Sequence, residues 1–186
     1  PDSPDQLDTD HLTEYLRQSG HLGRGRVVAA SASIIGTGKM GDNARIILEY
    51  EGDRGNAPNS LVAKFPATDA TARAMAGAQG AYYNEVMFYR NLAPGTAMRL
   101  PEIYGSEVSD DRSSFLLLME DLSPARPGSN LTGESREHAA QALAEVAKLA
   151  VAYYGDSTLG ERDYVLSAAR DDGGAFGQAL MEQSWP

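Results

Sequence analysis

Five short runs in the first part of the chain, some alternating between apolar and polar positions and one continuously apolar, are typical of strands, and helical spacing appears between them. Alternation with β-branched residues is typical of strands, whereas apolar residues three and four positions apart are typical of one helix face. The pattern predicts a short helix over 9–19 and a main helix over 79–92, where Pro94-Gly95 ends the repeat. The runs that predict strands are 26–35, 44–50, 61–66, 102–108 and 113–119.

The order of these elements indicates how they pack. Helices do not alternate regularly with the strands, as they would in a parallel, doubly wound sheet. The first two strands flank a glycine-rich turn, which indicates a hairpin. We therefore expect an α+β fold in which a five-stranded antiparallel sheet carries one main helix.

The composition changes after residue 122. Residues 123–133 contain two Pro and two Gly, which predicts a linker. The chain beyond it is rich in Ala and reads as helical. We therefore expect three parts, over residues 1–122, 123–133 and 134–186.

The last part has one long predicted helix, over 134–154, with Thr132 as its candidate N-cap. Residues 158–186 predict further helix, broken at Gly173-Gly174. One long helix with such a tail does not bury its own apolar face, so this helical part is expected to be incomplete. The face is available for self-association and is formed by Leu143, Val146, Ala147, Ala150 and Tyr154.

The composition narrows the class of protein. The 186 residues, 42% of them hydrophobic and 23% charged, suffice for a folded core. The absence of Cys excludes a disulfide scaffold, a thiolate zinc site and a thiol nucleophile. The 26 acidic and 16 basic side chains give a formal charge of −10, which disfavours binding to nucleic acid or an anionic membrane surface.

The sequence carries no membrane or export signal. Its longest uncharged apolar run is too short and too rich in Ser and Gly to span a bilayer. The first residues, PDSPDQLDTD, are acidic where a signal peptide is basic and then apolar. We therefore expect a cytoplasmic protein.

A glycine-rich loop, Gly36-Thr37-Gly38-Lys39-Met40-Gly41, follows the first strand with G-x-G-x-x-G spacing. Without Cβ atoms, such a loop can bring backbone N–H groups close to phosphates, although a simple hairpin turn explains it equally well. A dinucleotide fold requires a helix after the loop, but a strand is predicted here. A P-loop requires Gly at Ser33 and a hydroxyl residue at Met40. A loop between two strands that covers phosphates remains possible.

Lys64 interrupts the apolar third strand and shares a face with Val62. A lysine that points into a cleft needs an anionic partner or a ligand phosphate, because an unpaired buried ammonium is costly. Glu85, 21 residues on and among aromatic residues of the main helix, is a natural partner. The alternatives are a lysine that reaches solvent from an edge strand and a solvated glutamate.

The fifth strand ends in LLLMEDL, at residues 116–122, and runs directly into the linker. Backbone C=O and N–H groups exposed at such a junction can hydrogen-bond the edge of an adenine ring, and apolar residues can sandwich it.

Together these features resemble the protein-kinase-like fold, and within it the aminoglycoside phosphotransferase and ecdysteroid-kinase-like family of small-molecule kinases. The resemblance covers roughly residues 27–155 and includes the phrases EVMFYRNLAP and LPEIYG. It implies a nucleotide-binding N-terminal lobe followed by the first helices of a helical lobe. It also implies that Lys64 binds the α- and β-phosphates and pairs with Glu85, that Met119 stands behind the adenine pocket, and that the Glu120 carbonyl and Leu122 amide contact adenine.

The family also carries a catalytic loop, H-G-D-x-x-x-x-N, whose Asp accepts the substrate proton and whose Asn helps to hold Mg²⁺. In this chain no His precedes Gly-Asp, and after Gly155-Asp156 the Asn position is Glu161. The resemblance therefore implies the nucleotide-binding part of an ATP- or GTP-dependent kinase, with no catalytic residue and no turnover of its own. The Mg²⁺ ligands and the pocket for a small-molecule alcohol would belong to a missing part of the helical lobe.

A second class stays open, a non-catalytic nucleotide-sensing or protein-interaction module derived from such a lobe. A serine hydrolase is disfavoured because the chain lacks G-x-S-x-G. The spacing of His11, His21 and His138 fits no local pattern of metal ligands.

Overall fold

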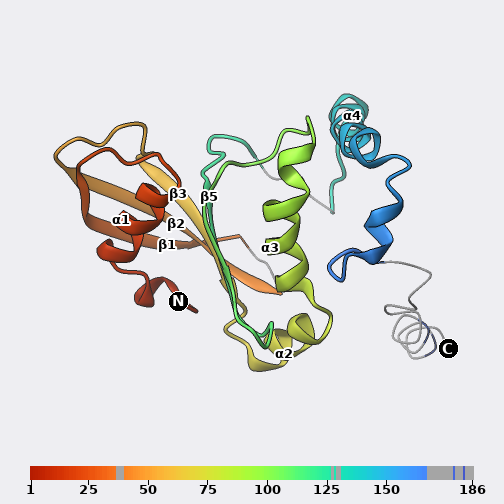
Figure 1. Ribbon diagram of the computed structural model, residues 1–186, viewed down its shortest axis with the longest axis horizontal. Helices are drawn as coiled ribbons and strands as arrows, with labels where there is room; N and C mark the ends of the chain where they lie inside the picture. Colours follow the sequence, from red (N-terminus) through yellow and green to blue (C-terminus); the bar gives the residue numbers. More distant parts are fainter. Residues whose placement is uncertain (37–39, 127, 129–130, 167–177, 179–181, 183–186) are drawn as a thin grey trace.

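The computed structural model describes residues 1–36, 40–126, 128, 131–166, 178 and 182. Its centre is one five-stranded sheet in the order β1-β2-β3-β5-β4, and all neighbouring strands are antiparallel. The chain is therefore an α+β protein (Figure 1). The strands are β1 (Arg26–Ile35), β2 (Gly41–Glu51), β3 (Ser60–Pro66), β4 (Ile103–Val108) and β5 (Phe115–Glu120).

Helices lie on both faces of this sheet, α1 on one face and α3 on the other (Figure 1). A longer helix, α4, follows the linker and lies on the side of α3 that is away from the sheet. The α-helices are α1 (Thr9–Gln18), α2 (Ala70–Ala78), α3 (Ala81–Asn91) and α4 (Arg136–Tyr153). The 3-10 helices are η1 (Pro4–Gln6), η2 (Ala93–Gly95) and η3 (Ser157–Glu161).

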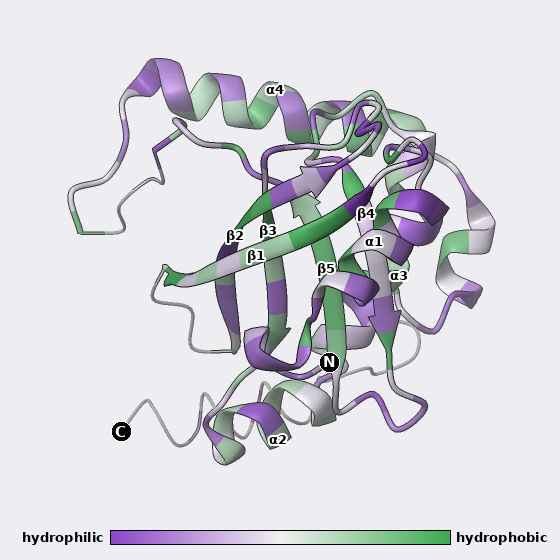
Figure 2. Ribbon diagram, turned by 90° about the vertical axis from the view of Figure 1, so that its left-hand side faces the viewer, coloured by the Kyte–Doolittle hydropathy of each residue, from purple (hydrophilic) through white to green (hydrophobic). Residues whose placement is uncertain are grey.

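Alternation along the strands divides the core into two apolar clusters. In β3, Leu61, Ala63 and Phe65 are buried on the α1 side, whereas Val62 packs on the α3 side. Strand β5, between β3 and β4, is buried on both faces and is apolar along its length (Figure 2). Each face of the sheet therefore has its own helix, and the α3 side carries the polar residues discussed below.

The predicted strands and hairpin are confirmed, with shifts of a few residues at their ends. The sequence pattern did not predict α2, which buries Ala76 and begins where Asp69 accepts a hydrogen bond from the Ala72 amide at 2.8 Å. The main helix begins at Ala81 rather than at residue 79. Gly80 separates it from α2 because its φ of 68° places the backbone in the left-handed region.

The predicted N-cap of the long helix, Thr132, is wrong. The helix begins after Ser135, whose hydroxyl accepts a hydrogen bond from the His138 amide at 3.1 Å. A cap side chain satisfies an amide that has no partner within the helix, so the position of Ser135 decides where α4 starts.

Helix α4 contacts the rest of the protein through a few polar groups. The Tyr153 hydroxyl donates to the Leu92 carbonyl at 2.5 Å, and the Arg99 amide donates to Glu145 Oε2 at 2.7 Å. The helix buries none of its residues, and Leu143, Val146 and Val151 are exposed, as is Tyr154 directly after it. None of the described helices has the length and apolarity that crossing a bilayer requires.

The structure covers little of the helix predicted over 158–186. The 3-10 helix η3 begins at Ser157, whereas Gly173-Gly174 and most residues beyond 166 lie outside the described part.

Candidate functional site

Lys64 and Glu85 form an ion pair between the sheet and α3. Lys64 Nζ lies 2.5 Å from Glu85 Oε1. The register places Lys64 between Asn43 of β2 and Leu117 of β5, so its side chain leaves the sheet on the α3 side. The two side chains are 26% and 31% exposed, which leaves both within reach of a ligand.

The packing of α3 against the sheet positions Glu85. Tyr82 and Val86 are buried on this side of the helix, and the Tyr82 ring stacks on Phe115 with centroids 4.5 Å apart. The Tyr82 hydroxyl also accepts a hydrogen bond from the Ala67 amide at 3.0 Å, directly after β3. These contacts hold the first turns of α3 against β3 and β5, next to Lys64.

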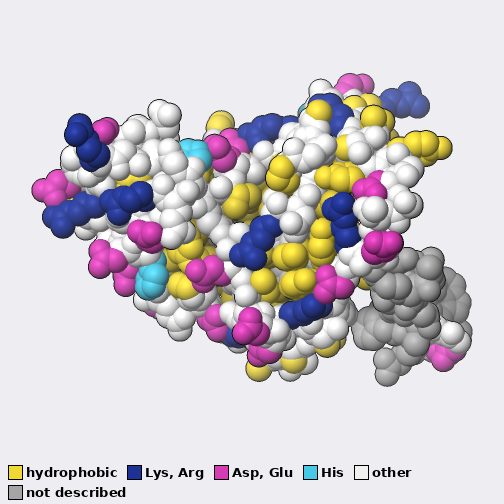
Figure 3. Space-filling view, in the orientation of Figure 1, with side chains coloured by type: hydrophobic (Ala, Val, Ile, Leu, Met, Phe, Trp, Pro, Cys, Tyr) yellow, Lys and Arg dark blue, Asp and Glu magenta, His cyan; other side chains and the backbone are white. Residues whose placement is uncertain are grey.

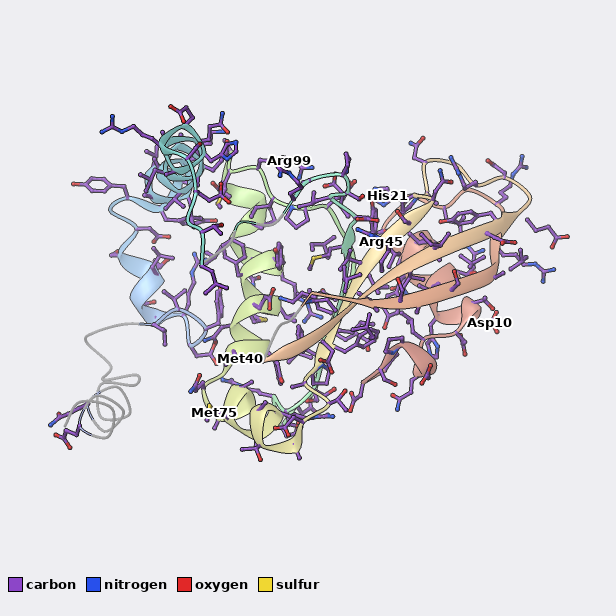
Figure 4. The ribbon with its side chains drawn as sticks, turned by 180° about the vertical axis from the view of Figure 1, so that it is seen from behind. Asp10, His21, Met40, Arg45, Met75 and Arg99 are labelled. Carbon is purple, nitrogen blue, oxygen red and sulfur yellow. The ribbon has the colours of Figure 1, made fainter. Side chains whose placement is uncertain are left out.

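A cavity of about 270 Å³ opens beside the ion pair. It lies where the β1–β2 loop returns to the sheet, and Figure 4 shows Met40 at this position beside α3. The lining residues are Met40, Gly41, Asn43, Lys64, Ala81, Tyr82, Glu85 and Phe115.

Gly41 allows the close approach of β2 to β3 at this cavity. A Cβ atom on Gly41 would lie 2.9 Å from the Phe65 carbonyl oxygen, closer than side-chain carbons normally come to a backbone oxygen. A larger residue at this position of the glycine loop would therefore force the backbone to shift. Gly36, at the other end of the loop, has a φ of 76°. Gly38 and Lys39 lie outside the described residues.

The end of β5 forms a second group of polar contacts. Met119 is buried on the α3 side and pairs with Val62 in the ladder. The Glu120 carboxylate accepts two hydrogen bonds from Arg99 Nη2, at 2.7 and 2.8 Å. The hydrogen bond from Arg99 holds the pKa of Glu120 below its ordinary value, against the opposing effect of burial.

Asp121, directly after β5, is held by a pairing that the sequence analysis missed. Its carboxylate accepts hydrogen bonds from Arg45 Nε at 2.8 Å, Arg45 Nη2 at 3.2 Å and Ser60 Oγ at 2.9 Å. Burial alone would raise the pKa of Asp121, but the hydrogen bonds from Arg45, Ser60 and the Ser123 amide outweigh it and lower that pKa. The available signal was the alternation of β2, which places Arg45 on the same face as Asn43.

The structure thus brings together part of the set that the sequence analysis selected. Gly41, Lys64 and Glu85 meet at the cavity. Met119 lies on the same face of the sheet, two residues after Leu117, the ladder partner of Lys64. The remaining described members, Gly36, Glu120 and Leu122, do not line the cavity.

Charged and apolar side chains are mixed on the surface of the molecule around α3. Figure 3 shows apolar side chains over α3, with Lys, Arg, Asp and Glu side chains among them. In Figure 4, Arg45 lies farther along the sheet than Met40, toward His21 and Arg99. The polar groups therefore extend along the sheet from the cavity to the end of β5.

Comparisons with known proteins identified no relative of this chain. The chain matches no known protein family, no curated protein and no solved structure. Among the described residues, no three His, Asp or Glu side chains gather as ligands of a metal ion would.

Proposed function

We propose that residues 1–122 form the nucleotide-binding part of a small-molecule kinase, similar to the N-terminal lobe of the aminoglycoside phosphotransferase and ecdysteroid-kinase-like family. The whole protein would transfer the γ-phosphoryl group of ATP or GTP to an alcohol. The observation that supports this most is the Lys64–Glu85 ion pair beside a cavity that Gly41 lines.

The ion pair has the chemistry that phosphate binding needs. An ammonium group has three N–H donors, and Glu85 takes one of them at 2.5 Å, so Lys64 retains donors for phosphate oxygens. Glu85 holds the ammonium in place and compensates its charge in the absence of a ligand. The absence of a side chain at Gly41 lets β2 lie close to the Phe65 carbonyl, which brings the end of the glycine loop to the cavity beside Lys64.

These residues bind the nucleotide and do not themselves transfer its phosphoryl group. Transfer to an alcohol depends on a positioned base and on charge neutralisation around the phosphoryl group. The sequence offers no H-G-D-x-x-x-x-N from which to take the base. We therefore expect no kinase activity from these residues alone.

Isothermal titration calorimetry with ATP and GTP, each with and without Mg²⁺, tests the proposal. Lys64→Met should weaken nucleotide binding by about tenfold or more, the loss expected for a charge-assisted contact. Lys148→Met is the matched control, because Lys148 also pairs with a glutamate, at 2.6 Å, but on α4. No binding by the wild-type protein, or equal losses in both variants, would contradict the proposed function.

The exposed side chains of α4 favour a second candidate, a non-catalytic nucleotide-binding module that acts by self-association. Leu143 is 69% exposed and Val151 is 78% exposed on a helix that buries none of its residues. Light scattering over a range of concentrations, with Leu143→Ser and Val151→Ser in one variant, tests this role. A monomeric wild-type protein at every concentration would count against self-association.

A further inference from the structure

The two edge strands of the sheet differ in how their outer edges are protected. The strand order makes β1 and β4 the outermost strands. An edge strand carries unpaired backbone N–H and C=O groups, and proteins protect such edges with short strands, irregular pairing, charged side chains or a covering segment. Strand β4 has six residues, includes Glu107, and shifts register between Ile103 and Gly105. Arg90 of α3 also donates a hydrogen bond to the Ser106 carbonyl at 2.5 Å, so this edge is protected.

Strand β1 lacks this protection over most of its length. It has ten residues, with no charged residue and no Pro after Arg26. Its register with β2 is continuous from Ala29 to Ile35. The backbone groups of residues 28–35 form no hydrogen bond with any described residue outside the ladder with β2. Every second residue of a strand directs its N–H and C=O groups away from the neighbouring strand, so β1 presents a row of backbone groups that can pair with another strand.

The side chains in the middle of β1 are uncovered as well. Helix α1 protects the start of the strand, where Val27 is buried and its amide donates to Thr13 Oγ1 at 3.0 Å. Residues 30–34 are all exposed, although successive side chains of a strand point to opposite faces of the sheet. Two larger apolar side chains are among the exposed ones, since Val28 is 44% exposed and Ile34 is 66% exposed.

This exposed stretch is complementary to itself in an antiparallel arrangement. Val28 and Ile34 stand three residues before and three residues after Ser31. When two copies pair about Ser31, Val28 of one copy lies opposite Ile34 of the other, and only Ala and Ser residues lie between them. No like charges oppose each other along this stretch, although each copy has a formal charge of −10.

We propose that β1 is a dimer interface, at which it pairs with β1 of a second copy, antiparallel and centred on Ser31. The two sheets then form one continuous sheet, with five strands from each copy. Such pairing has two-fold symmetry and closes after two copies, because the protected edge of β4 offers no second site. A strand of another protein would need apolar residues at the same spacing, whereas every copy of this chain carries them.

The interface is separate from the proposed nucleotide site and from the exposed side chains of α4. The dimer uses the outer edge of β1, whereas Lys64 and Glu85 lie on β3 and α3. The inference therefore does not depend on nucleotide binding.

Cysteine cross-linking tests the position of the interface, because the chain has no Cys of its own. In Ser31→Cys the two new side chains face each other with Cβ atoms about 5 Å apart, within reach of a short bifunctional thiol reagent. Thr71→Cys, at an exposed position of α2, is the matched control for random collisions. Leu143→Cys reports on association through α4. We expect a covalent dimer from Ser31→Cys and from neither of the other two variants.

Charged residues at the centre of the interface test the register. Ser31→Lys and Ser31→Glu each place like charges opposite each other, which should weaken dimerisation by about tenfold or more in analytical ultracentrifugation. An equimolar mixture of the two variants places Lys opposite Glu and should restore the dimer. Thr71→Lys changes the charge equally but away from the edge, so it should dimerise as the wild-type protein does. Ser31 is exposed in the single copy, so these variants are expected to fold.

Four results would overturn the inference. The first is a wild-type protein that stays monomeric up to about 1 mM. The second is equal cross-linking of all three cysteine variants, or cross-linking of Leu143→Cys alone. The third is a dimer that Ser31→Lys leaves unchanged. The fourth is a mixture of Ser31→Lys and Ser31→Glu that stays monomeric.

Discussion

Lys64 Nζ and Glu85 Oε1 lie 2.5 Å apart and join β3 to α3. The pair bridges a sheet and a helix that are held together by a separate apolar cluster, which includes Tyr82, Val86 and Phe115. Apolar contacts therefore dock the helix on the sheet beside the ion pair.

The ion pair is expected to contribute little to stability. Both side chains are partly exposed, and exposed pairs contribute modestly because water screens them. A double-mutant cycle with Lys64→Ala and Glu85→Ala, followed by urea denaturation, should give a coupling energy below about 1 kcal/mol. A coupling above about 2 kcal/mol would mean that the pair serves the fold instead.

The apolar core should be far more sensitive to truncation. Leu118 of β5 is completely buried on the side of the sheet that α1 covers. Leu118→Ala removes its packing contacts and leaves a cavity. We expect a loss of about 2–5 kcal/mol in the free energy of unfolding. The exposed Leu143 provides the control, since Leu143→Ala should change the same quantity by less than about 0.5 kcal/mol. Equal losses in chemical denaturation would contradict this division between core and surface.

The contacts of the Asp121 carboxylate with Arg45, Ser60 and the Ser123 amide make a specific contribution to the dependence of stability on pH. The pKa of Asp121 is lowered in the folded state from the ordinary value of 3.8. The stabilisation is therefore present above that value and is lost as the pH falls through the lower pKa of the folded protein.

Asp121→Asn isolates this contribution from those of other carboxylates. The difference in unfolding free energy between wild-type and variant should shrink as the pH falls from about 5 to about 2. Urea denaturation at several pH values in this interval measures it. A difference that stays constant over the whole interval would show that the Asp121 carboxylate is not stabilised by its charge.

The glycine at the start of β2 should tolerate no side chain. In Gly41→Ala the new Cβ would meet the Phe65 carbonyl oxygen at 2.9 Å, and that oxygen belongs to the neighbouring strand. We expect a loss of about 1–3 kcal/mol, typical of an overpacked site, with a lower melting temperature in calorimetry.

Gly160→Ala is the matched control for this substitution. A Cβ at Gly160 meets no described atom within 4 Å, so its melting temperature should stay close to that of the wild-type protein. A Gly41→Ala variant as stable as Gly160→Ala would show that β2 and β3 can separate at this point.

The spacing of apolar residues was enough to predict the five strands, α1 and the main helix. It also predicted that Lys64 shares a face with Val62, because the side-chain period of a strand is a local property. The helix α2 escaped prediction, since its residues, ATARAMAGA, show no clear apolar face and only Ala76 of this helix becomes buried.

Contacts between distant segments were decided by the tertiary structure. From the sequence, the ion pair of Lys64 with Glu85 was only a hypothesis. The packing of Tyr82 on Phe115 orients α3 so that the two side chains meet. The pairing of Arg45 with Asp121 joins residues 76 positions apart, and the alternation of β2 indicates the face of Arg45 but not its partner. The sequence by itself determined which elements form, because periodicity acts over a few residues. Which polar groups meet was decided by the register of β2, β3 and β5, since only that register brings their side chains to one face.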